Sequence, residues 1–193
     1  MSVIGITGGI GTGKSTVTQF LLSKNYRVID ADGISRQITN GRTETVEKLA
    51  QAFGKKILKE DGTLNRQALA DQVFGNQERE KLLEKIVTQK VVSIIEKQVS
   101  EAGEELVFMD VPLLFETGLD RLADSIWVVT ACEELRIRRV MERDKITCQQ
   151  VKSRMKCQMP EEEKLKRATV ILDNSGDKET LFKKIEMELE KNA

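Results

Sequence analysis

Residues 8–15 near the amino terminus read Gly-Gly-Ile-Gly-Thr-Gly-Lys-Ser, which fits the pattern G-x-x-x-x-G-K-[ST] in full. The pattern follows a short apolar run and precedes a segment of helical periodicity, so a strand, a loop and a helix are expected in that order. Glycines let the backbone wrap closely enough for its N–H groups to point at phosphate oxygens. The amino end of the new helix adds positive potential. The sequence therefore predicts a site that binds the phosphates of a nucleotide.

The residues of this loop have different expected roles. Lys14 is expected to reach the β- and γ-phosphates, and Ser15 to offer its hydroxyl to Mg²⁺. The Thr16 hydroxyl is placed to meet the α-phosphate. The backbone cradle itself is expected to consist of Gly8, Gly9, Ile10, Gly11, Thr12 and Gly13.

Two aspartates follow other apolar runs. Asp110 ends the run that begins at Leu106, and it is the candidate for a second Mg²⁺ contact. The alternative is a polar strand end that caps the following turn. Asp32 follows the run Tyr26–Ile29 and is the candidate to accept the proton of an acceptor hydroxyl. The alternative is that Asp32 caps the next helix, and spacing alone leaves both possibilities open.

Three arginines lie at helical spacing late in the chain. Arg136, Arg139 and Arg143 fall at i, i+3 and i+7 on one face of an expected helix, and Arg154 follows in the next helical piece. Surface arginines are commonly just solvated. After a phosphate loop, however, a mobile segment that carries arginines can close on the phosphates, neutralise charge in the transition state and exclude water.

Short apolar runs alternate with helical patterns along the chain, which is typical of a parallel α/β sheet. A core is expected over about 1–33, 102–131 and 167–193, interrupted by a helical insertion over about 34–101 and a polar lid over about 132–166. The five expected strands are Val3–Thr7, Tyr26–Ile29, Leu106–Met109, Ile126–Thr130 and Val170–Leu172.

The insertion consists of amphipathic pieces. One helix presents Val46, Leu49 and Phe53 on one face, and Asn65 is expected to cap another. A longer helix follows, and its apolar stripe is expected to contain Leu82, Leu83, Ile86, Val87, Val91, Ile94 and Ile95.

Composition excludes several classes of mechanism. The chain has no histidine, which removes Ser-His-Asp hydrolases and HExxH zinc proteases. Its three cysteines, Cys132, Cys148 and Cys157, show no CxxC spacing, so reduced thiols in a cytoplasmic protein are the expectation. The net charge is zero, and no apolar stretch approaches the length of a membrane span. Neither nucleic acid nor a membrane is therefore expected as a partner.

A regulatory GTPase is the rival from a different class. It would carry an N-K-x-D guanine-reading motif, which is absent, and a D-x-x-G motif, where this chain has Asp110-Val111-Pro112-Leu113. Kinases that act on nucleoside monophosphates or shikimate share the loop, the aspartate and the arginines, so the residues alone leave the acceptor open. A nucleotide-binding protein without catalysis would require the Asp32 and arginine features to be accidental.

Longer runs of sequence resemble the dephospho-CoA kinases over nearly the whole chain. The run Ile4–Ser15 looks like the first strand and phosphate loop of that family, and Val28–Asp32 looks like its second-strand aspartate motif. Asp110–Glu116 is similar to the signature after its third strand, and Ile171–Gly176 to its last strand with an Asn-Ser-Gly turn. The insertion resembles the family's acceptor-binding domain, and the residues that carry this resemblance are Phe53-Gly54, Asp61-Gly62-Thr63-Leu64-Asn65-Arg66 and Val73-Phe74. The later polar segment resembles the family's lid at Arg139, Met141, Arg143, Asp144, Arg154, Gln158, Met159 and Pro160.

This resemblance implies a P-loop kinase fold, in which a five-stranded parallel sheet is flanked by helices. The implied reaction is transfer of phosphate from ATP, with Mg²⁺, to the ribose 3′-hydroxyl of dephospho-CoA, the last step of coenzyme A synthesis. The implied partner is this small molecule alone, and the protein is expected to be a monomer or at most a weak homo-oligomer.

The resemblance also assigns site residues. Asp32 would be the catalytic base, and Lys14 and Arg139 would stabilise the transferring group. Arg143 of the lid and Asn174 near adenine would contact ATP. The acceptor would be lined by Asp32, Leu113, Leu114, Phe115 and Glu116.

One position departs from the family pattern. The long helix of the insertion usually carries a His-Pro pair, where this chain has Thr88-Gln89. Because proline bends or breaks a helix, a straighter helix is expected here.

Overall fold

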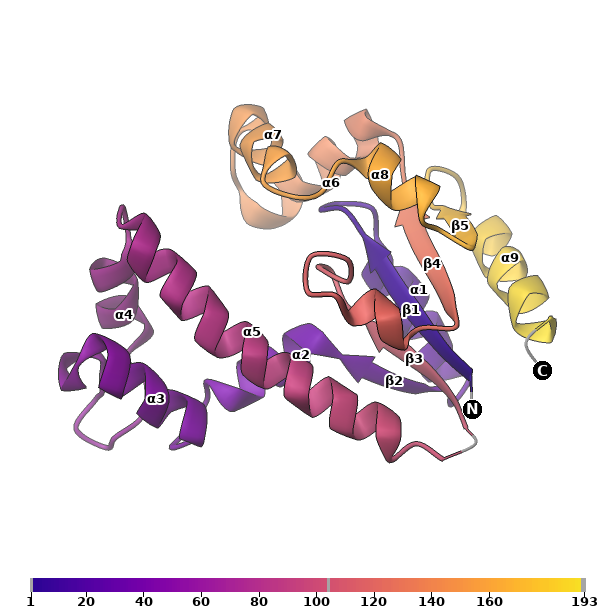
Figure 1. Cartoon of the computed structure of the whole chain (residues 1–193). Coiled ribbons are helices and arrows are strands. Elements are labelled where there is room, and N and C mark those ends of the chain that lie inside the picture. Colours follow the sequence, from indigo (N-terminus) through magenta and orange to yellow (C-terminus); the bar gives the residue numbers. More distant parts are fainter. Residues whose placement is uncertain (1, 104, 192–193) are drawn as a thin grey trace. The chain divides into compact units, whose positions relative to one another are not determined.

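The computed structural model describes residues 2–103 and 105–191. The chain divides into two compact units (Figure 1), which are Met1–Ile29 with Val99–Ala193, and Asp30–Gln98. The first is called the core unit here and the second the helical insertion. The insertion begins and ends a few residues earlier than the expected range of 34–101.

The core unit is built on five strands, β1 Ser2–Gly8, β2 Arg27–Asp30, β3 Leu106–Asp110, β4 Ser125–Thr130 and β5 Val170–Asp173. Their order across the sheet is β2-β3-β1-β4-β5. The central strand β1 pairs in parallel with β3 (Ile4 with Phe108) and with β4 (Ile6 with Trp127). The expected parallel α/β sheet and its five strands are thereby confirmed.

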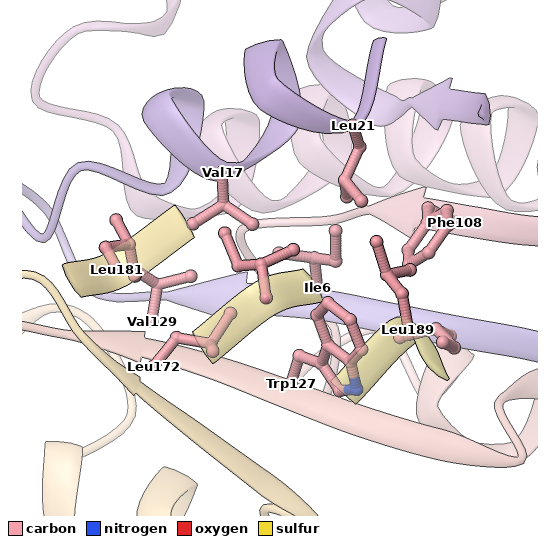
Figure 2. Packing of buried hydrophobic residues seen from close by; sticks show 11 residues of the cluster. Ile6, Val17, Leu21, Phe108, Trp127, Val129, Leu172, Leu181 and Leu189 are labelled. Atoms are coloured by element: carbon pink, nitrogen blue, oxygen red, sulfur yellow. The ribbon is translucent and has the colours of Figure 1, made fainter. Parts of the chain in front are cut away.

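One face of the sheet is covered by α1 (Lys14–Ser23) and α9 (Lys178–Glu190). Figure 2 shows the apolar cluster that these two helices form with the sheet, which includes Ile6, Leu21 and Trp127. Apolar side chains at alternate positions of β1 reach this face because successive residues of a strand point to opposite sides. The indole Nε1 of Trp127 is a buried polar atom without a hydrogen-bond partner among the described residues, and Trp127 is the single tryptophan of the chain.

The opposite face of β1 lies against the segment that follows β3. A Cβ added to Gly5 would lie 2.9 Å from Cδ2 of Leu114, and Leu114 is completely buried. The segment ends in a short 3₁₀ helix, η2 Leu119–Leu122. This packing holds the segment after Asp110 close to the central strand.

Three helices fill the range expected as a lid, namely α6 Glu133–Asp144, α7 Cys148–Lys156 and α8 Glu161–Lys166. Thr147 caps α7 through a capping box with Gln150, and Pro160 occupies the N-cap position of α8. The expected break at Pro160 is therefore present. Among the described residues of this range, the buried side chains include two charged ones, Arg136 and Lys164, beside Val140 and Val151, so part of the range belongs to the interior of the core unit.

The helical insertion contains α2 Ala31–Ile38, α3 Glu44–Phe53, the 3₁₀ helix η1 Lys55–Ile57, α4 Arg66–Val73 and most of α5 Gln77–Ser100. Its apolar core joins α3, η1 and α4, with Leu49 and Ile57 completely buried. Asn65 caps α4 as expected, since its side chain accepts a hydrogen bond from the Ala68 N–H. Helix α5 runs without interruption through Thr88.

The expected apolar stripe of α5 is wrong at its amino end. Leu82 is 40% exposed, whereas Val91, Ile95 and Val99 are buried. These three residues repeat every four positions and therefore share one helix face. The prediction failed at Leu82 because the periodicity of a long helix does not show which neighbour lies beside each turn.

The described part of the chain contains no helix whose length and apolar character would let it cross a membrane.

Candidate active site

The strand order places a topological switch point between β1 and β3, and the place outside the carboxyl ends of these two strands is called the crevice here. The chain leaves β1 for β2 on one side of the sheet and leaves β3 for β4 on the other. In open α/β sheets, ligands bind outside the carboxyl ends of strands at such a switch point. Here β1 runs into the phosphate loop and β3 ends at Asp110, so the two motifs found in the sequence meet at this crevice.

The phosphate loop connects the buried end of β1 to helix α1. Gly13 is the N-cap residue of α1 in the left-handed conformation, with φ of 83°, which only glycine adopts without strain. No acidic residue occupies the first turn of α1, so the positive end of the helix dipole is not neutralised locally. Ser15 is exposed in this turn and Thr16 is half-buried. The loop therefore has the electrostatics of an anion site.

Lys14 and Asp110 join the two sides of the crevice. Their side chains form an ion pair in which the lysine is 15% and the aspartate 7% exposed. The hydroxyl of Thr18, one turn after Lys14, donates a hydrogen bond of 2.6 Å to the other carboxylate oxygen of Asp110. Asp110 is thus held in place by two donors from α1. The alternative that Asp110 only caps the following turn does not account for these contacts.

Side chains from α6 and from the end of β5 contact the loop. Arg139 Nη1 lies 3.5 Å from the Gly11 carbonyl oxygen and 3.4 Å from that of Thr12, and its Nη2 donates to the Asn174 carbonyl at 3.0 Å. The side chain of Asn174 is buried and donates a hydrogen bond of 2.8 Å to the Thr12 carbonyl. The structure therefore brings Arg139 and Asn174 together at the phosphate loop.

The third arginine of the predicted helix face has different surroundings. Arg143 forms two hydrogen bonds with the carboxylate of its neighbour Asp144, of 2.7 and 3.1 Å, and Arg154 from α7 donates to the same carboxylate at 2.7 Å. The hydrogen bond from Arg143 lowers the pKa of Asp144, and the nearby charges of Arg143 and Arg154 add to this. Both arginines are more than half exposed, so this cluster lies on the surface of the core unit.

The segment after Asp110 contains the four residues expected to line the acceptor. Leu114 is completely buried and Phe115 nearly so, whereas Leu113 is 36% exposed. The Glu116 carboxylate accepts a hydrogen bond of 3.2 Å from the Met159 N–H and lies 3.5 Å from Nζ of the buried Lys164. The acceptor-binding role of the four residues stays a prediction.

Asp32 lies in the helical insertion, at the second position of α2 and two residues after β2 ends. Its side chain is exposed. The N-cap position of α2 belongs to Asp30, which pairs with Arg36 at 3.4 Å. Among the contacts of the described residues, none involves the Asp32 carboxylate, so the alternative that Asp32 caps this helix finds no support.

The insertion also forms a cavity of about 480 Å³ that is open to solvent. Leu49, Leu69, Val73 and Val87 form part of an apolar lining. The other lining residues are Ser35, Thr39, Leu64, Arg66, Ala70, Glu80, Leu83, Glu84 and Thr88. An apolar cavity with a few polar groups at its edge is a common form of small-molecule site.

The model of the dephospho-CoA kinase family matches residues 2–180. The chain belongs to the dephospho-CoA kinase family. Dephospho-CoA kinase from Fusobacterium nucleatum is 38% identical over 184 residues, covering 95% of both chains. Dephospho-CoA kinase from Carboxydothermus hydrogenoformans is 40% identical over 188 residues, covering 96% of this chain and 91% of the relative. The solved dephospho-CoA kinase from Campylobacter jejuni superposes with a TM-score of 0.70 at 26% identity, covering 98% of this chain and 96% of that one.

Family membership confirms the resemblance found in the sequence and the P-loop kinase fold. It also decides between the alternatives that the residues left open. The family model and the relatives favour a dephospho-CoA kinase over a nucleoside monophosphate kinase, a shikimate kinase and a non-catalytic nucleotide-binding protein. A dephospho-CoA kinase is an enzyme that uses ATP.

Sequence reasoning gave no specific role to several residues of this dephospho-CoA kinase site. Thr18 has a detectable signal, because it follows Lys14 by one helical turn and carries a hydroxyl on the same face. Gln158 accepts a hydrogen bond of 2.9 Å from the Ile10 N–H, and the buried Lys164 lies 3.4 Å from the Pro112 carbonyl oxygen. These contacts join residues far apart in the chain, which no local pattern reveals.

Proposed function

We propose that this chain transfers the γ-phosphoryl group of ATP to the 3′-hydroxyl of dephospho-CoA through the residues of the crevice and Asp32. The observation that carries the proposal is the Lys14–Asp110 pair beside the phosphate loop, in a chain of the dephospho-CoA kinase family. The reaction is the last step of coenzyme A synthesis and releases ADP. The transferred group carries charge on its equatorial oxygens in the transition state, so positioning and electrostatics supply most of the catalysis.

Lys14 stabilises the transferring group because its ammonium is a fixed positive charge at the edge where the loop ends. The loop backbone from Gly8 to Thr16 binds the triphosphate, and Arg139 adds positive charge beside Gly11 and Thr12. Arg143 lies on the lid and is the candidate to contact ATP when the lid closes. Exclusion of water by the lid would prevent hydrolysis of ATP.

Asp32 is the proposed general base. Its carboxylate is exposed and has no hydrogen-bond partner among the described residues, so it can accept the proton of the acceptor hydroxyl and aim the oxygen at the γ-phosphorus. The proton moves to a carboxylate oxygen of Asp32 as the bond from the ribose oxygen to phosphorus forms and the bond to the β-phosphate oxygen breaks.

Mg²⁺ fits the donors at the crevice. Mg²⁺ in kinase sites is held by one or two protein oxygens, phosphates and water, and Ser15 with Asp110 would supply a hydroxyl and a carboxylate. The described residues hold no group of three His, Cys, Asp or Glu side chains that could form a cage of protein ligands, which is compatible with an ion carried by the nucleotide. Mg²⁺ would neutralise charge on the β- and γ-phosphates.

The cavity of the insertion is the proposed site for the uncharged arm of dephospho-CoA, which is a chain of amides, methyl groups and a thiol. Its apolar lining suits the methyl groups, and Ser35 and Thr88 are the proposed hydroxyl partners of the amides. Val87→Trp would fill the cavity, and we expect it to raise KM for dephospho-CoA while KM for ATP stays unchanged. Lys85→Trp, on the exposed side of the same helix, is the matched control.

The setting proposed for the enzyme is the cytoplasm. The three cysteines are free and exposed, and the cytosol keeps such thiols reduced. The protein is proposed to act as a monomer or at most a weak homo-oligomer, and light scattering across a range of protein concentrations measures this directly.

The experiment that tests the function is a coupled assay of ADP release with Mg·ATP and four acceptors: dephospho-CoA, AMP, CMP and shikimate. Stimulation by dephospho-CoA alone, with coenzyme A identified by mass, is the expected result. Asp32→Asn should lower kcat by orders of magnitude while ATP still binds. Near-normal turnover of this variant would remove Asp32 from the mechanism, and stimulation by another acceptor would overturn the assignment of the substrate.

A further inference from the structure

Two carbonyl groups of the phosphate loop are held from outside the loop by buried side chains. Arg136 Nε donates to the Ile10 carbonyl at 3.1 Å, and Asn174 Nδ2 donates to the Thr12 carbonyl at 2.8 Å. Both donor residues are only 4% exposed. These are specific contacts from buried groups, in contrast to the exposed arginines of the lid.

Peptide geometry converts each held carbonyl into a directed donor. In a planar trans peptide, the C=O of one residue and the N–H of the next point in opposite directions. The described residues contain no cis peptide bond. Holding the Ile10 carbonyl outward therefore turns the Gly11 N–H to the other side, and holding the Thr12 carbonyl outward does the same for the Gly13 N–H. Within the described part of the chain, neither of these two N–H groups donates a hydrogen bond to a protein acceptor.

Both holding residues are anchored at the end of β4, Arg136 through its side chain and Asn174 through its backbone. Arg136 forms an ion pair with Glu161, and the Glu161 carboxylate also accepts a hydrogen bond from the Thr130 hydroxyl. The Asn174 N–H donates to the Thr130 carbonyl at 2.8 Å. A satisfied polar network of this kind, in which Arg136 and Asn174 are buried and the Glu161 side chain is 31% exposed, restricts the movement of its members. The sheet therefore fixes the direction of the loop donors through Arg136 and Asn174.

The glycines of the loop match these contacts. A Cβ on Gly9 would collide with Nη2 of Arg136, and a Cβ on Gly13 would collide with Nδ2 of Asn174. Gly9 is a variable position of the G-x-x-x-x-G-K-[ST] pattern, so phosphate binding by itself does not require glycine there. The approach of Arg136 supplies a reason for glycine at this position.

We infer that Arg136 and Asn174 are positioning residues for phosphate binding, which hold the carbonyls of Ile10 and Thr12 outward so that the N–H groups of Gly11 and Gly13 face the phosphates. The inference rests on the proposed function, because it assumes that the loop binds the triphosphate of ATP. It differs from the expectation for Asn174 near adenine, which the resemblance to the family implied. If Asn174 positions the phosphate loop, its loss weakens binding of the phosphates; if it contacts adenine, its loss weakens binding of the base.

Isothermal titration calorimetry with three probes separates these roles: ADP, inorganic triphosphate, which has no adenine, and adenosine, which has no phosphate. All titrations use the full chain with Mg²⁺. Asn174→Ala and Arg136→Lys should each weaken the binding of ADP and of inorganic triphosphate by the same factor, roughly 10- to 100-fold as for the loss of a hydrogen bond to a charged group, and leave the affinity for adenosine unchanged. In the kinase assay, KM for ATP should rise while KM for dephospho-CoA stays constant, which a general loss of stability would not produce.

Arg138→Lys is the matched control, because Arg138 lies on the same helix and is exposed; it should leave all three affinities unchanged. Trp127 fluorescence reports whether each variant is folded. If Asn174→Ala does not fold, Asn174→Asp and Arg136→Lys decide, since both keep a polar group in the buried position and lose the donor geometry.

Loss of ADP and adenosine binding with triphosphate binding intact would overturn the inference for Asn174 and assign it to adenine. Equal affinities in folded variants and wild type would overturn it for both residues. A wild-type protein that binds neither ADP nor triphosphate would contradict the proposed function itself, independently of the variants.

Discussion

Several charged and polar side chains that contact the phosphate loop or its helix are buried, whereas the ion-paired side chains of Glu44, Lys48 and Lys90 in the helical insertion remain in water. Arg136, Asn174 and Asp110 are each 4–5% exposed, and each has a partner on another element. In the insertion, the ion pairs of Glu44 with Lys48 and Lys90 involve side chains that are 36–57% exposed. Stability there comes from the apolar cluster around Leu49 and Ile57.

This difference matches the demands on each region. Donors that stabilise a transition state must be held in direction before the reaction, and a buried polar network does this. A region that only has to enclose an uncharged group can rely on apolar packing, which is not directional. Substitutions around the phosphate loop should therefore lower activity more than stability. Substitutions in the insertion should lower stability more than activity.

The largest effect is expected for Lys14→Met. Loss of one charged donor to the transferring group should lower kcat by at least about 10²–10³-fold. Lys24→Met is the control, because Lys24 lies on the same loop-helix segment and pairs with Glu186 in the solvent; its kcat should match wild type. A Lys14→Met enzyme within tenfold of wild-type kcat would show that the loop region does not depend on this charge.

Next is Leu49→Ala in the insertion. Leu49 is completely buried, and the substitution should cost about 2–5 kcal/mol through lost transfer energy and a cavity. Hydrogen exchange of α3 and α4 should accelerate, and circular dichroism should report unfolding before the fluorescence of Trp127 in the core unit does. Leu82→Ala removes the same atoms from an exposed site and should cost less than about 0.5 kcal/mol. Simultaneous unfolding by both probes would mean that the two regions do not differ in this way.

A smaller effect is expected for Thr18→Val. This change keeps the shape and removes the hydroxyl that donates to Asp110, so it should cost about 1.5–3 kcal/mol as a hydrogen bond to a charged group. We also expect a higher Mg²⁺ concentration for half-maximal activity, because the Asp110 carboxylate loses one of the donors that hold it. Thr18→Ser retains the hydroxyl and should restore the wild-type Mg²⁺ dependence. An unchanged dependence in the valine variant would separate Asp110 from the metal.

The smallest effect is expected for Glu44→Gln. Hydrogen bonds from Lys48 and Lys90 lower the pKa of Glu44 to about 2 from 4.5. Because the folded pKa is the lower one, the contribution to stability is present above pH 4.5 and is lost as the pH falls toward 2. The melting temperature of the variant should lie slightly below wild type at pH 7, and high salt should remove the difference. Glu47→Gln on the same helix is the control, and a difference that survives 1 M salt would argue for buried electrostatics in the insertion.

Local patterns were sufficient for the parts of the protein that depend on neighbouring residues. The phosphate loop, all five strands and the Asn65 cap were predicted because glycine conformations, apolar runs and capping side chains act over a few residues. Family membership followed from longer runs such as Asp110–Glu116. The acceptor could not be chosen from the loop, the aspartate and the arginines alone, since these features are common to small-molecule kinases.

Tertiary structure decided which of the equivalent side chains are buried. Arg136 and Arg143 are the same residue type on the same predicted face of α6, yet Arg136 is buried against Glu161 and Ile10 while Arg143 pairs with Asp144 at the surface. The spacing of a helix shows which residues share a face, but not which element packs on each turn. For Arg136 the partners lie 25 and 126 residues away, and only the folded chain brings them together.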